Sequence, residues 1–310
     1  MTPVGASAPG KALLCGEYAV LEGAPAMVSA VDRRVSVIWS KDSMHMPPEV
    51  EATLRLAQTE LGPVPRTPVV DVTDLHQDGV KLGLGSSAAA ATATAGAVFA
   101  THGRSLEDPV TLRRVFACAL EGHASVAPQG SGVDVAASTF GGFLRFARIE
   151  SEVEVHAVQP PGTLEIRLVW TGHAARTSDL VGKVRELQRD DPRGYRSSID
   201  RLSELSQQFG NAFESGNATE VVTLAASYAD AMEALGIAAG APIVEARLRR
   251  AAELAARFSG SAKPCGAGGG DVAVAFFLDP MAAKGFEGAC KNEGLHPIDV
   301  SWGAKGVRVR

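Results

Sequence analysis

An alanine-rich segment directly after a glycine turn is the feature that most constrains the fold of this chain. Residues 86–100 read Ser-Ser-Ala-Ala-Ala-Ala-Thr-Ala-Thr-Ala-Gly-Ala-Val-Phe-Ala, a helix-forming composition with almost no polar face. A helix that is apolar on all sides must be buried. Because its small side chains let neighbouring backbone approach closely, we expect this helix to direct its first turn at a group in the middle of the protein.

Length and composition favour a globular protein of two domains. The 310 residues are 45% hydrophobic and 21% charged, and such a chain divides most naturally into domains of about 150 residues. The turn sequence Gln159-Pro160-Pro161-Gly162 places the expected boundary near residue 160. We therefore expect domains 1–160 and 161–310. Strands interleave with helices without a βαβ repeat, which predicts an α+β fold.

Local patterns predict many of the individual elements. Asp108 and Pro109 supply a cap and a first-turn proline, and apolar residues then recur at helical spacing, so a helix is expected over 108–121. Short β-type runs occupy Val35–Trp39 and Val69–Val72. In the second half we expect a strand over 164–171, helices over 178–190, 197–214, 218–235 and 241–258, a strand over 271–278, a helix begun by Asp279-Pro280, and a β segment from Ile298 onward.

Charge and hydropathy exclude several classes of partner. The formal net charge is −5 with a pI near 5.8, and no run of Lys or Arg stands clear of acidic neighbours. This argues against a nucleic-acid partner. No uninterrupted apolar stretch approaches the ~20 residues of a membrane span, and residues 1–10 lack the regions of a signal peptide. We expect a cytoplasmic protein without a membrane partner.

The cysteines indicate neither a metal site nor a disulfide framework. They are scattered, with no CxxC pair and no nearby histidine at metal-ligand spacing. We therefore expect all of them to be free thiols that act as small apolar side chains. They are Cys15, Cys118, Cys265 and Cys290.

The strongest local signal for chemistry is the segment Gly83-Leu84-Gly85-Ser86-Ser87-Ala88, which leads directly into the alanine-rich helix. Glycines let the backbone pass close to a ligand, and the N–H groups of a first helical turn attract an anion such as a phosphate. The serine hydroxyls can add a ligand to the phosphates or to Mg²⁺. Taken alone, the segment also fits a glycine-rich loop with a serine N-cap. No GxxxxGK[ST] occurs, which excludes a Walker P-loop.

Three further segments carry candidate site residues. The loop 263–271, Lys-Pro-Cys-Gly-Ala-Gly-Gly-Gly-Asp, holds four glycines before an apolar strand, a density that ordinary loops rarely need. Asp134 lies between small residues in Gly130–Ser138, where a helix cap is the alternative to catalysis. Lys11 and Glu17 flank the apolar run Ala12–Leu14, and taken singly Lys11 also fits a solvated lysine.

Four motifs in this order resemble the GHMP kinase superfamily, which is named for galactokinase, homoserine kinase, mevalonate kinase and phosphomevalonate kinase. They are Pro-Gly-Lys-x-x-Leu-x-Gly-Glu-Tyr at 9–18, Gly-Leu-Gly-Ser-Ser-Ala-Ala at 83–89, Ser-Gly-x-Asp at 131–134 and Gly-Ala-Gly-Gly-Gly-Asp at 266–271. The resemblance spans nearly the whole chain. It implies a two-domain fold with a ribosomal-protein-like N-terminal domain and a ferredoxin-like C-terminal domain, in which ATP and the acceptor meet between the domains.

Within the superfamily, the motifs look most like those of the phosphomevalonate kinase family, as does the segment Trp170–Ser178. Mevalonate kinases usually have Asn after the catalytic aspartate, whereas Val135 follows Asp134 here. Cys265 is a departure, because the phosphomevalonate kinase family more often has Ser at that position. We expect backbone amides to carry the role of this loop.

The resemblance implies a role for each motif. Lys11 and Asp134 are the expected catalytic residues, with Asp134 acting as a base or positioning Lys11. ATP is expected at Gly83, Gly85, Ser86, Ser87 and Ala88. Mg²⁺ is expected on Ser87, with Glu121 as a candidate second ligand. The acceptor, 5-phosphomevalonate, is expected at Glu17, Tyr18, Ser131, Gly132, Gly266, Ala267, Gly268 and Gly269.

Several alternatives stay open from the sequence. Lys81, His123, Arg176 and Lys263 are basic residues that the acceptor phosphate can use, although each alone also fits a surface residue. The acceptor can instead be mevalonate, homoserine or another small molecule. A GHMP-fold sensor without turnover and a diphosphomevalonate decarboxylase are further alternatives. We expect a monomer or a homodimer.

Overall fold

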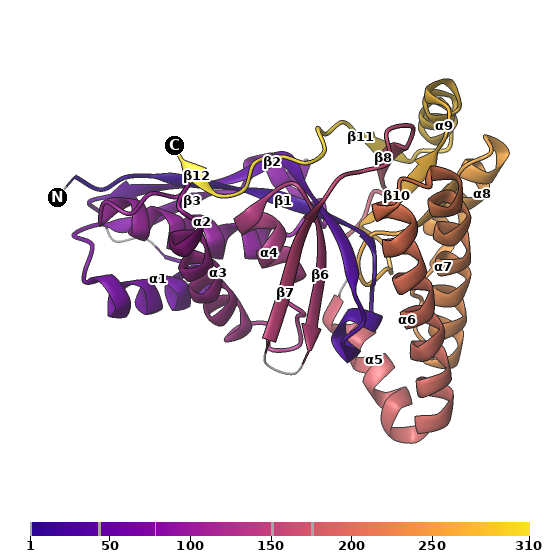
Figure 1. Ribbon diagram of the computed structural model, residues 1–310, viewed down its shortest axis with the longest axis horizontal. Helices are drawn as coiled ribbons and strands as arrows, with labels where there is room; N and C mark the ends of the chain where they lie inside the picture. The colour runs from indigo at the N-terminus through magenta and orange to yellow at the C-terminus, as the bar shows by residue number, and fades with distance from the viewer. Residues whose placement is uncertain (1, 43–44, 78, 150–151, 175–176) are drawn as a thin grey trace. The chain divides into compact units, whose positions relative to one another are not determined.

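A computed structural model describes residues 2–42, 45–77, 79–149, 152–174 and 177–310 (Figure 1). Contacts divide the chain into unit 1, formed by Met1–Ala12, Val28–Leu144 and Ser301–Arg310, and unit 2, formed by Leu13–Met27 and Arg145–Val300. This division differs from the predicted split at residue 160, because three strands contribute residues to both units. These are β1 (Ala6–Cys15), β2 (Ala26–Ser40) and β6 (Phe143–Ile149).

Unit 1 is built around the alanine-rich helix α2 (Ser86–Thr101). Every residue of α2 from Ala88 to Phe99 is buried, as the absence of a polar face predicts. The helices α1 (Pro48–Leu61), α3 (Pro109–Ala124) and α4 (Val133–Phe140) all pack against α2. The α3 prediction is confirmed, since the Asp108 carboxylate accepts a hydrogen bond from Thr111 N at 2.9 Å. The sequence interpretation did not include α1 or α4.

The strands of the larger sheet follow the order β12–β1–β2–β6–β7, and β3 also pairs with β2. The C-terminal segment closes the edge through β12 (Arg308–Val309), which is antiparallel to β1. The other strands are β3 (Thr67–Asp71) and β7 (Glu152–Val158). Two short strands, β4 (His76–Gln77) and β5 (Val80–Lys81), pair with each other, and the 3₁₀ turns are η1 (Ala19–Glu22) and η2 (Thr73–Leu75).

Unit 2 contains a four-stranded antiparallel sheet in the order β11–β8–β10–β9. Its strands are β8 (Glu165–Trp170), β9 (Ser261–Pro264), β10 (Val272–Phe277) and β11 (His296–Ile298). Trp170, the last residue of β8, pairs with Val272, the first residue of β10, and with His296, the first residue of β11. The end of β8 and the starts of β10 and β11 therefore lie at the same edge of the sheet. The loops after β8 and before β10 are therefore neighbours.

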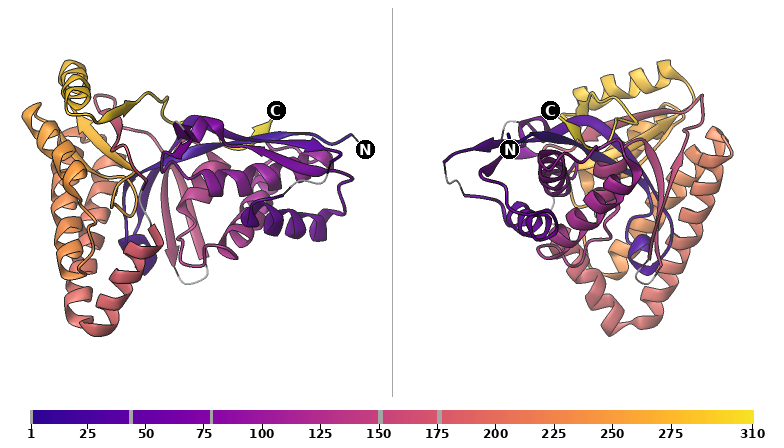
Figure 2. Two further views of the ribbon diagram at one scale, coloured as in Figure 1. Left: turned by 180° about the vertical axis from the view of Figure 1, so that it is seen from behind. Right: turned by 60° about the vertical axis from the view of Figure 1, so that its left-hand side comes forward.

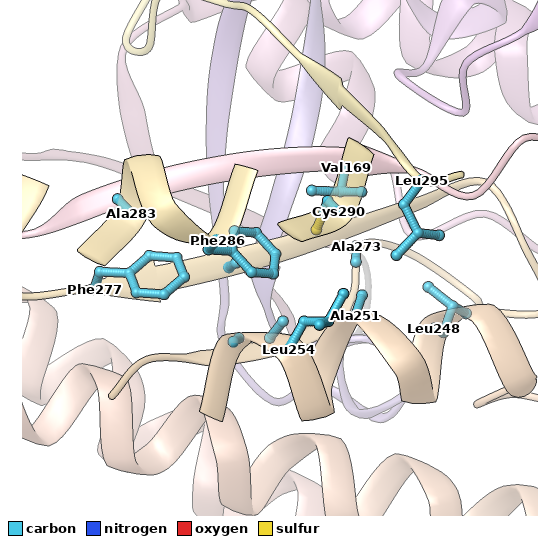
Figure 3. Packing of buried hydrophobic residues seen from close by; sticks show 13 residues of the cluster. Val169, Leu248, Ala251, Leu254, Ala273, Phe277, Ala283, Phe286, Cys290 and Leu295 are labelled. Carbon is cyan, nitrogen blue, oxygen red and sulfur yellow. The ribbon is translucent and has the colours of Figure 1, made fainter. Parts of the chain in front are cut away.

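Five helices of unit 2 were expected from the sequence. They are α5 (Thr177–Asp190), α6 (Pro192–Glu214), α7 (Ala218–Ala238), α8 (Ala246–Arg257) and α9 (Pro280–Asn292). The long helices α6 and α7 lie side by side in every view (Figures 1 and 2). Figure 3 shows Phe277 of β10 beside Phe286 of α9, while Leu248 and Leu254 of α8 point toward the same apolar cluster. This cluster holds α8 and α9 against the sheet.

One helix of the described residues, α7, is long and apolar enough to cross a membrane by length and composition alone. Helices buried in the core of a globular protein meet the same criterion of length and composition. In unit 2, Val221, Tyr228 and Met232 of α7 are buried.

The expectation for the cysteines is confirmed. Cys15, Cys118, Cys265 and Cys290 are all free and buried. Burial raises the pKa of the Cys15 thiol well above its ordinary value. The charge of Lys263 lowers this pKa by a smaller amount, and the charge of Glu17 raises it slightly further. A buried thiol with a raised pKa is unreactive.

Candidate active site

The start of α2 forms an anion-binding terminus in unit 1. Gly85 precedes the helix with φ +79° and provides no side-chain cap. The first backbone hydrogen bond of the helix runs from Ala89 N to Gly85 O at 3.0 Å. Within the described residues, the N–H groups of Ser86, Ser87 and Ala88 therefore have no protein acceptor. Such free amides and the helix dipole together favour a phosphate.

Lys11 and Asp134 both lie close to this terminus. Lys11 N donates to Leu84 O at 2.9 Å, which fixes β1 next to the glycine turn. An ideal Cβ on Gly85 would lie 3.0 Å from Lys11 Cγ and 3.8 Å from Asp134 Cβ. On α4, Ser138 Oγ donates to Pro9 O at 2.8 Å and ties the helix that carries Asp134 to β1. The structure thus brings together the lysine, the aspartate and the phosphate loop predicted from three distant motifs.

A cavity of about 460 Å³ adjoins the same serines in unit 1. This volume is typical of small-molecule sites, which range over ~300–1,000 Å³. Proline and valine side chains supply apolar walls, while Lys81, Ser86 and Ser87 supply polar groups. The full lining is His45, Pro47, Pro48, Glu49, Pro68, Val69, Val70, Val72, His76, Lys81, Ser86, Ser87 and Ala90.

Among the described residues, the Ser87 side chain makes one hydrogen bond, to a histidine of α3. Its Oγ lies 3.1 Å from Nε2 of His123, which is only 7% exposed. Glu121, the other proposed Mg²⁺ ligand, is exposed and lies two residues from His123. Residues two apart on a helix do not share a face. His123, rather than Glu121, is therefore the α3 residue that contacts Ser87.

The residues present fit a nucleotide-bound Mg²⁺ better than a metal held by the protein alone. In the part of the chain that the structure describes, no group of three or more His, Cys, Asp or Glu side chains is arranged to hold a metal ion. Mg²⁺ is usually bound by one or two protein ligands together with substrate phosphates and water. The Ser87 hydroxyl can supply one such oxygen next to the free amides of α2.

Ser131 and Gly132 shape the start of α4. Ser131 Oγ accepts a hydrogen bond from Val133 N at 3.3 Å, and Gly132 has φ +88°. A Cβ on Gly132 would lie 2.5 Å from Leu120 Cδ1. These contacts orient the first turn of α4, on which Asp134 lies. A role of either residue in acceptor binding stays a prediction.

The glycine loop of unit 2 also has free amides. In the segment 265–271, four N–H groups donate to the protein: Cys265 to Val272 O, Gly266 to the Glu17 carboxylate, Gly269 to Ile243 O and Asp271 to His173 O. Among the described residues, the N–H groups of Ala267, Gly268 and Gly270 have no protein acceptor. Glycines with positive φ and unused amides favour an anion.

Glu17 and Tyr18, both predicted to bind the acceptor, contact this loop. Glu17 is 2% exposed and forms an ion pair with the buried Lys263. The Tyr18 hydroxyl donates to Ala267 O at 2.5 Å. Burial, followed by the charge of Glu17, raises the pKa of Tyr18 well above its ordinary value, so the hydroxyl stays protonated as a donor. The side chains of these two residues position the loop.

The basic residues have different environments. Lys81 is exposed and lines the cavity, and His123 contacts Ser87. Arg176 lies outside the described residues. Lys263 is 1% exposed and paired with Glu17, which the glycine pattern alone did not indicate. The same cluster contains Tyr228 of α7, which the sequence interpretation missed.

Comparisons with known proteins agree with the motifs. A sequence model of the GHMP kinases N terminal domain matches residues 55–142. The phosphomevalonate kinase of Streptomyces sp. is 27% identical, with coverage of 89% of this chain and 90% of the relative. The mevalonate kinase of Aeropyrum pernix is 29% identical, with coverage of 91% of both chains.

Solved structures share the fold at low sequence identity. A Lin0012 protein from Listeria innocua has a TM-score of 0.91 at 22% identity, covering 100% of this chain and 99% of that one. The Streptococcus pneumoniae phosphomevalonate kinase, in complex with phosphomevalonate and AMPPNP, has a TM-score of 0.83 at 18% identity, covering 96% and 99%. The predicted α+β GHMP fold is confirmed, and the family supports an ATP-dependent phosphotransferase. The chain is thus similar to GHMP kinases over about nine tenths of its length, and residues 55–142 match the model of their N terminal domain.

Proposed function

We propose that this protein is a kinase of the mevalonate route to isoprenoids that transfers the γ-phosphoryl group of ATP to 5-phosphomevalonate, giving 5-diphosphomevalonate. The observation that carries the proposal is the arrangement in unit 1 of the free amides of α2, with Lys11 and Asp134 both next to Gly85. The choice of acceptor is supported by the likeness to a phosphomevalonate kinase over 89% of the chain.

The nucleotide is proposed to bind in unit 1. Its phosphates fit the free N–H groups of Ser86, Ser87 and Ala88, and Lys81 adds a positive charge at the cavity. The apolar walls at Pro68 and Val70 suit the base, because small-molecule sites combine apolar linings with a few polar groups.

In the proposed transfer, an oxygen of the acceptor phosphate attacks the γ-phosphorus while the bond to the β-phosphate oxygen breaks and ADP leaves. This step needs alignment of two polyanions and neutralisation of charge on the transferred group. Lys11 supplies positive charge beside the phosphate loop. Because the acceptor phosphate has a second pKa near ~6, it is ionised at neutral pH. Asp134 then need not take a proton, and its charge positions Lys11.

Ser87 is the residue of this chain that would hold Mg²⁺. Bound there, the ion would neutralise negative charge on the phosphate groups during transfer. When His123 Nε2 accepts a hydrogen bond from the Ser87 hydroxyl, both lone pairs of the Ser87 oxygen stay available for a ligand.

The acceptor is proposed to use the free amides of the unit 2 loop, at Ala267, Gly268 and Gly270. These amides suit the anionic acceptor because none of them has a protein acceptor among the described residues. Lys263 does not serve as a cation for the acceptor in this proposal, since its ammonium group is already paired with Glu17.

A mevalonate kinase is the second candidate, because mevalonate kinases such as that of Aeropyrum pernix match nearly the whole chain. With an alcohol acceptor, Asp134 would have to accept the hydroxyl proton as a general base. ADP release measured with 5-phosphomevalonate, mevalonate, homoserine and galactose, together with CO₂ release from 5-diphosphomevalonate, separates the candidates. We expect turnover with 5-phosphomevalonate. Turnover with none of these acceptors would contradict the proposed function.

A further inference from the structure

We infer that the buried ion pair of Glu17 and Lys263, with Tyr228, is a positioning device that sets the start of the glycine loop 265–270 for the acceptor. This inference rests on the proposed function. The two side chains lie 246 residues apart in the sequence and are 1% and 0% exposed. A buried ion pair is weak evidence for stability, because desolvation of both charges offsets much of their attraction. A functional reason for the pair is therefore worth testing.

The contacts of the pair converge on the first residues of the loop. Glu17 Oε1 accepts hydrogen bonds from Lys263 Nζ and from Gly266 N, the latter at 3.2 Å. Lys263 Nζ also donates to Pro264 O at 2.6 Å. One carboxylate oxygen thus links Lys263, the residue before the last in β9, to the first amide of the glycine run.

The Cβ side of Gly266 is open, whereas neighbouring atoms close that side of Gly268 and Gly269. Gly266 has φ +116°, and among the described residues no heavy atom beyond its chain neighbours lies within 4 Å of the position of a Cβ, so no packing contact restrains it on that side. By contrast, a Cβ on Gly268 would lie 2.1 Å from Ile243 O, and one on Gly269 would lie 2.7 Å from Leu180 Cδ1. The packed glycines are held by neighbours, whereas Gly266 is held by Glu17.

Tyr228 supports both members of the pair from α7. Its hydroxyl donates to Glu17 O at 2.8 Å, and its ring centroid lies 5.6 Å from Lys263 Nζ. The second carboxylate oxygen, Glu17 Oε2, is buried without a hydrogen-bond partner among the described residues. An unsatisfied buried oxygen is costly, so a pair selected for stability alone would be expected to satisfy it.

The consequence is that Lys263 acts on the acceptor through the loop and does not touch it. By fixing Gly266, the pair sets where the next amide, that of Ala267, points, and the Tyr18 hydroxyl holds Ala267 O on the other side. Glu17, Lys263 and Tyr228 are positioning residues in this account.

Two double variants separate loop positioning from stability. Glu17→Leu/Lys263→Met removes both charges and the acceptor for Gly266 N. Glu17→Gln/Lys263→Met also removes both charges but keeps a side-chain oxygen in the same place. Removing a buried pair as a whole is often neutral for stability, whereas breaking it is not. We expect both doubles to unfold in urea near the parent midpoint, and Lys263→Met alone to unfold earlier.

The kinetic result distinguishes the two roles. At saturating ATP, we expect the Leu/Met double to lose at least tenfold in kcat/KM for 5-phosphomevalonate, mainly through KM, and the Gln/Met double to stay within threefold of the parent. The Kd for ATP should stay within twofold in both, because the proposed nucleotide site lies in unit 1. Parent-like kinetics of the Leu/Met double, or equal losses in both doubles, would overturn the inference.

A readout without turnover keeps this inference distinct from the proposed function. Amide hydrogen exchange at Gly266, followed by NMR, should be fast in the Leu/Met double and protected in the parent and the Gln/Met double. Equal protection in all three overturns the inference even if no acceptor is ever found. Should the doubles not fold, Tyr228→Phe removes only the hydroxyl that donates to Glu17 O. It should speed exchange at Gly266, and unchanged exchange would contradict the inference.

Discussion

Gly85→Ala should weaken ATP binding by at least tenfold, and the structure gives two reasons. Gly85 has φ +79°, a conformation that costs a residue with a side chain roughly 1–2 kcal/mol. The new methyl group would also lie 3.0 Å from Lys11 Cγ and 3.4 Å from Lys11 Cε. It would therefore push the lysine aside and occupy the approach to the free amides of α2. A tenfold loss of affinity corresponds to about 1.4 kcal/mol.

Gly103→Ala is the matched control, because it repeats the backbone strain without the contact. Gly103 lies beyond the other end of α2 with φ +73°, and nothing lies within 4 Å of its Cβ position. Urea unfolding should show a similar loss of about 1–2 kcal/mol for both variants. Titration calorimetry with ATP should show weaker binding only for Gly85→Ala. Equal affinities in both variants and the parent would refute the placement of the phosphates at α2.

Other predictions follow from the same geometry. Asp134→Asn should lower kcat by at least ~10²-fold, as loss of a charge that organises the transition state typically does, and a kcat within threefold of the parent in a folded variant would remove Asp134 from the mechanism. Ser87→Ala should raise the Mg²⁺ concentration needed for half-maximal rate, and an unchanged Mg²⁺ dependence would exclude Ser87 as a ligand. Hydrogen bonds from Thr111 hold the pKa of the Asp108 carboxyl below its ordinary value of 3.8. The ionised carboxylate therefore stabilises the folded protein above pH 3.8, and this stabilisation is lost as the pH falls toward the lower pKa of the folded state. Asp108→Asn, which keeps a cap, should therefore make the unfolding free energy fall less steeply below pH 4, and an unchanged slope in acid would contradict this.

The sequence predicted the parts of the site that depend on local pattern. A helix with no polar face had to be buried, and α2 is. The glycine turn and the start of α2 were expected to bind an anion, and the N–H groups in the first turn of α2 have no protein acceptor among the described residues. Asp108 and Pro109 begin α3 as their capping chemistry requires.

The sequence could not predict contacts between residues far apart in the chain. Lys263 was considered as a cation for the acceptor, yet it is buried against Glu17, because the topology of unit 2 brings β9 beside the turn after β1. Nothing in a one-dimensional pattern indicates that a lysine has a partner 246 residues away.

Missed elements had weaker local signals. The helix α1 begins at Pro48 and buries Val50, Leu54 and Ala57 at helical spacing, but no helix was predicted there. The strand β7 (Glu152–Val158) alternates between exposed and half-buried positions, and its polar residues were interpreted as a change of pattern near the domain boundary.

The most direct test of the central claim is the ratio of kcat/KM for 5-phosphomevalonate to that for mevalonate, at saturating ATP and Mg²⁺. A site that uses buried donors for an acceptor phosphate leaves them unpaired when mevalonate binds, a penalty that commonly gives discrimination of ~10⁴ or more. We therefore predict a steep preference for 5-phosphomevalonate. Equal values, or a preference for mevalonate, would contradict this account and favour a mevalonate kinase.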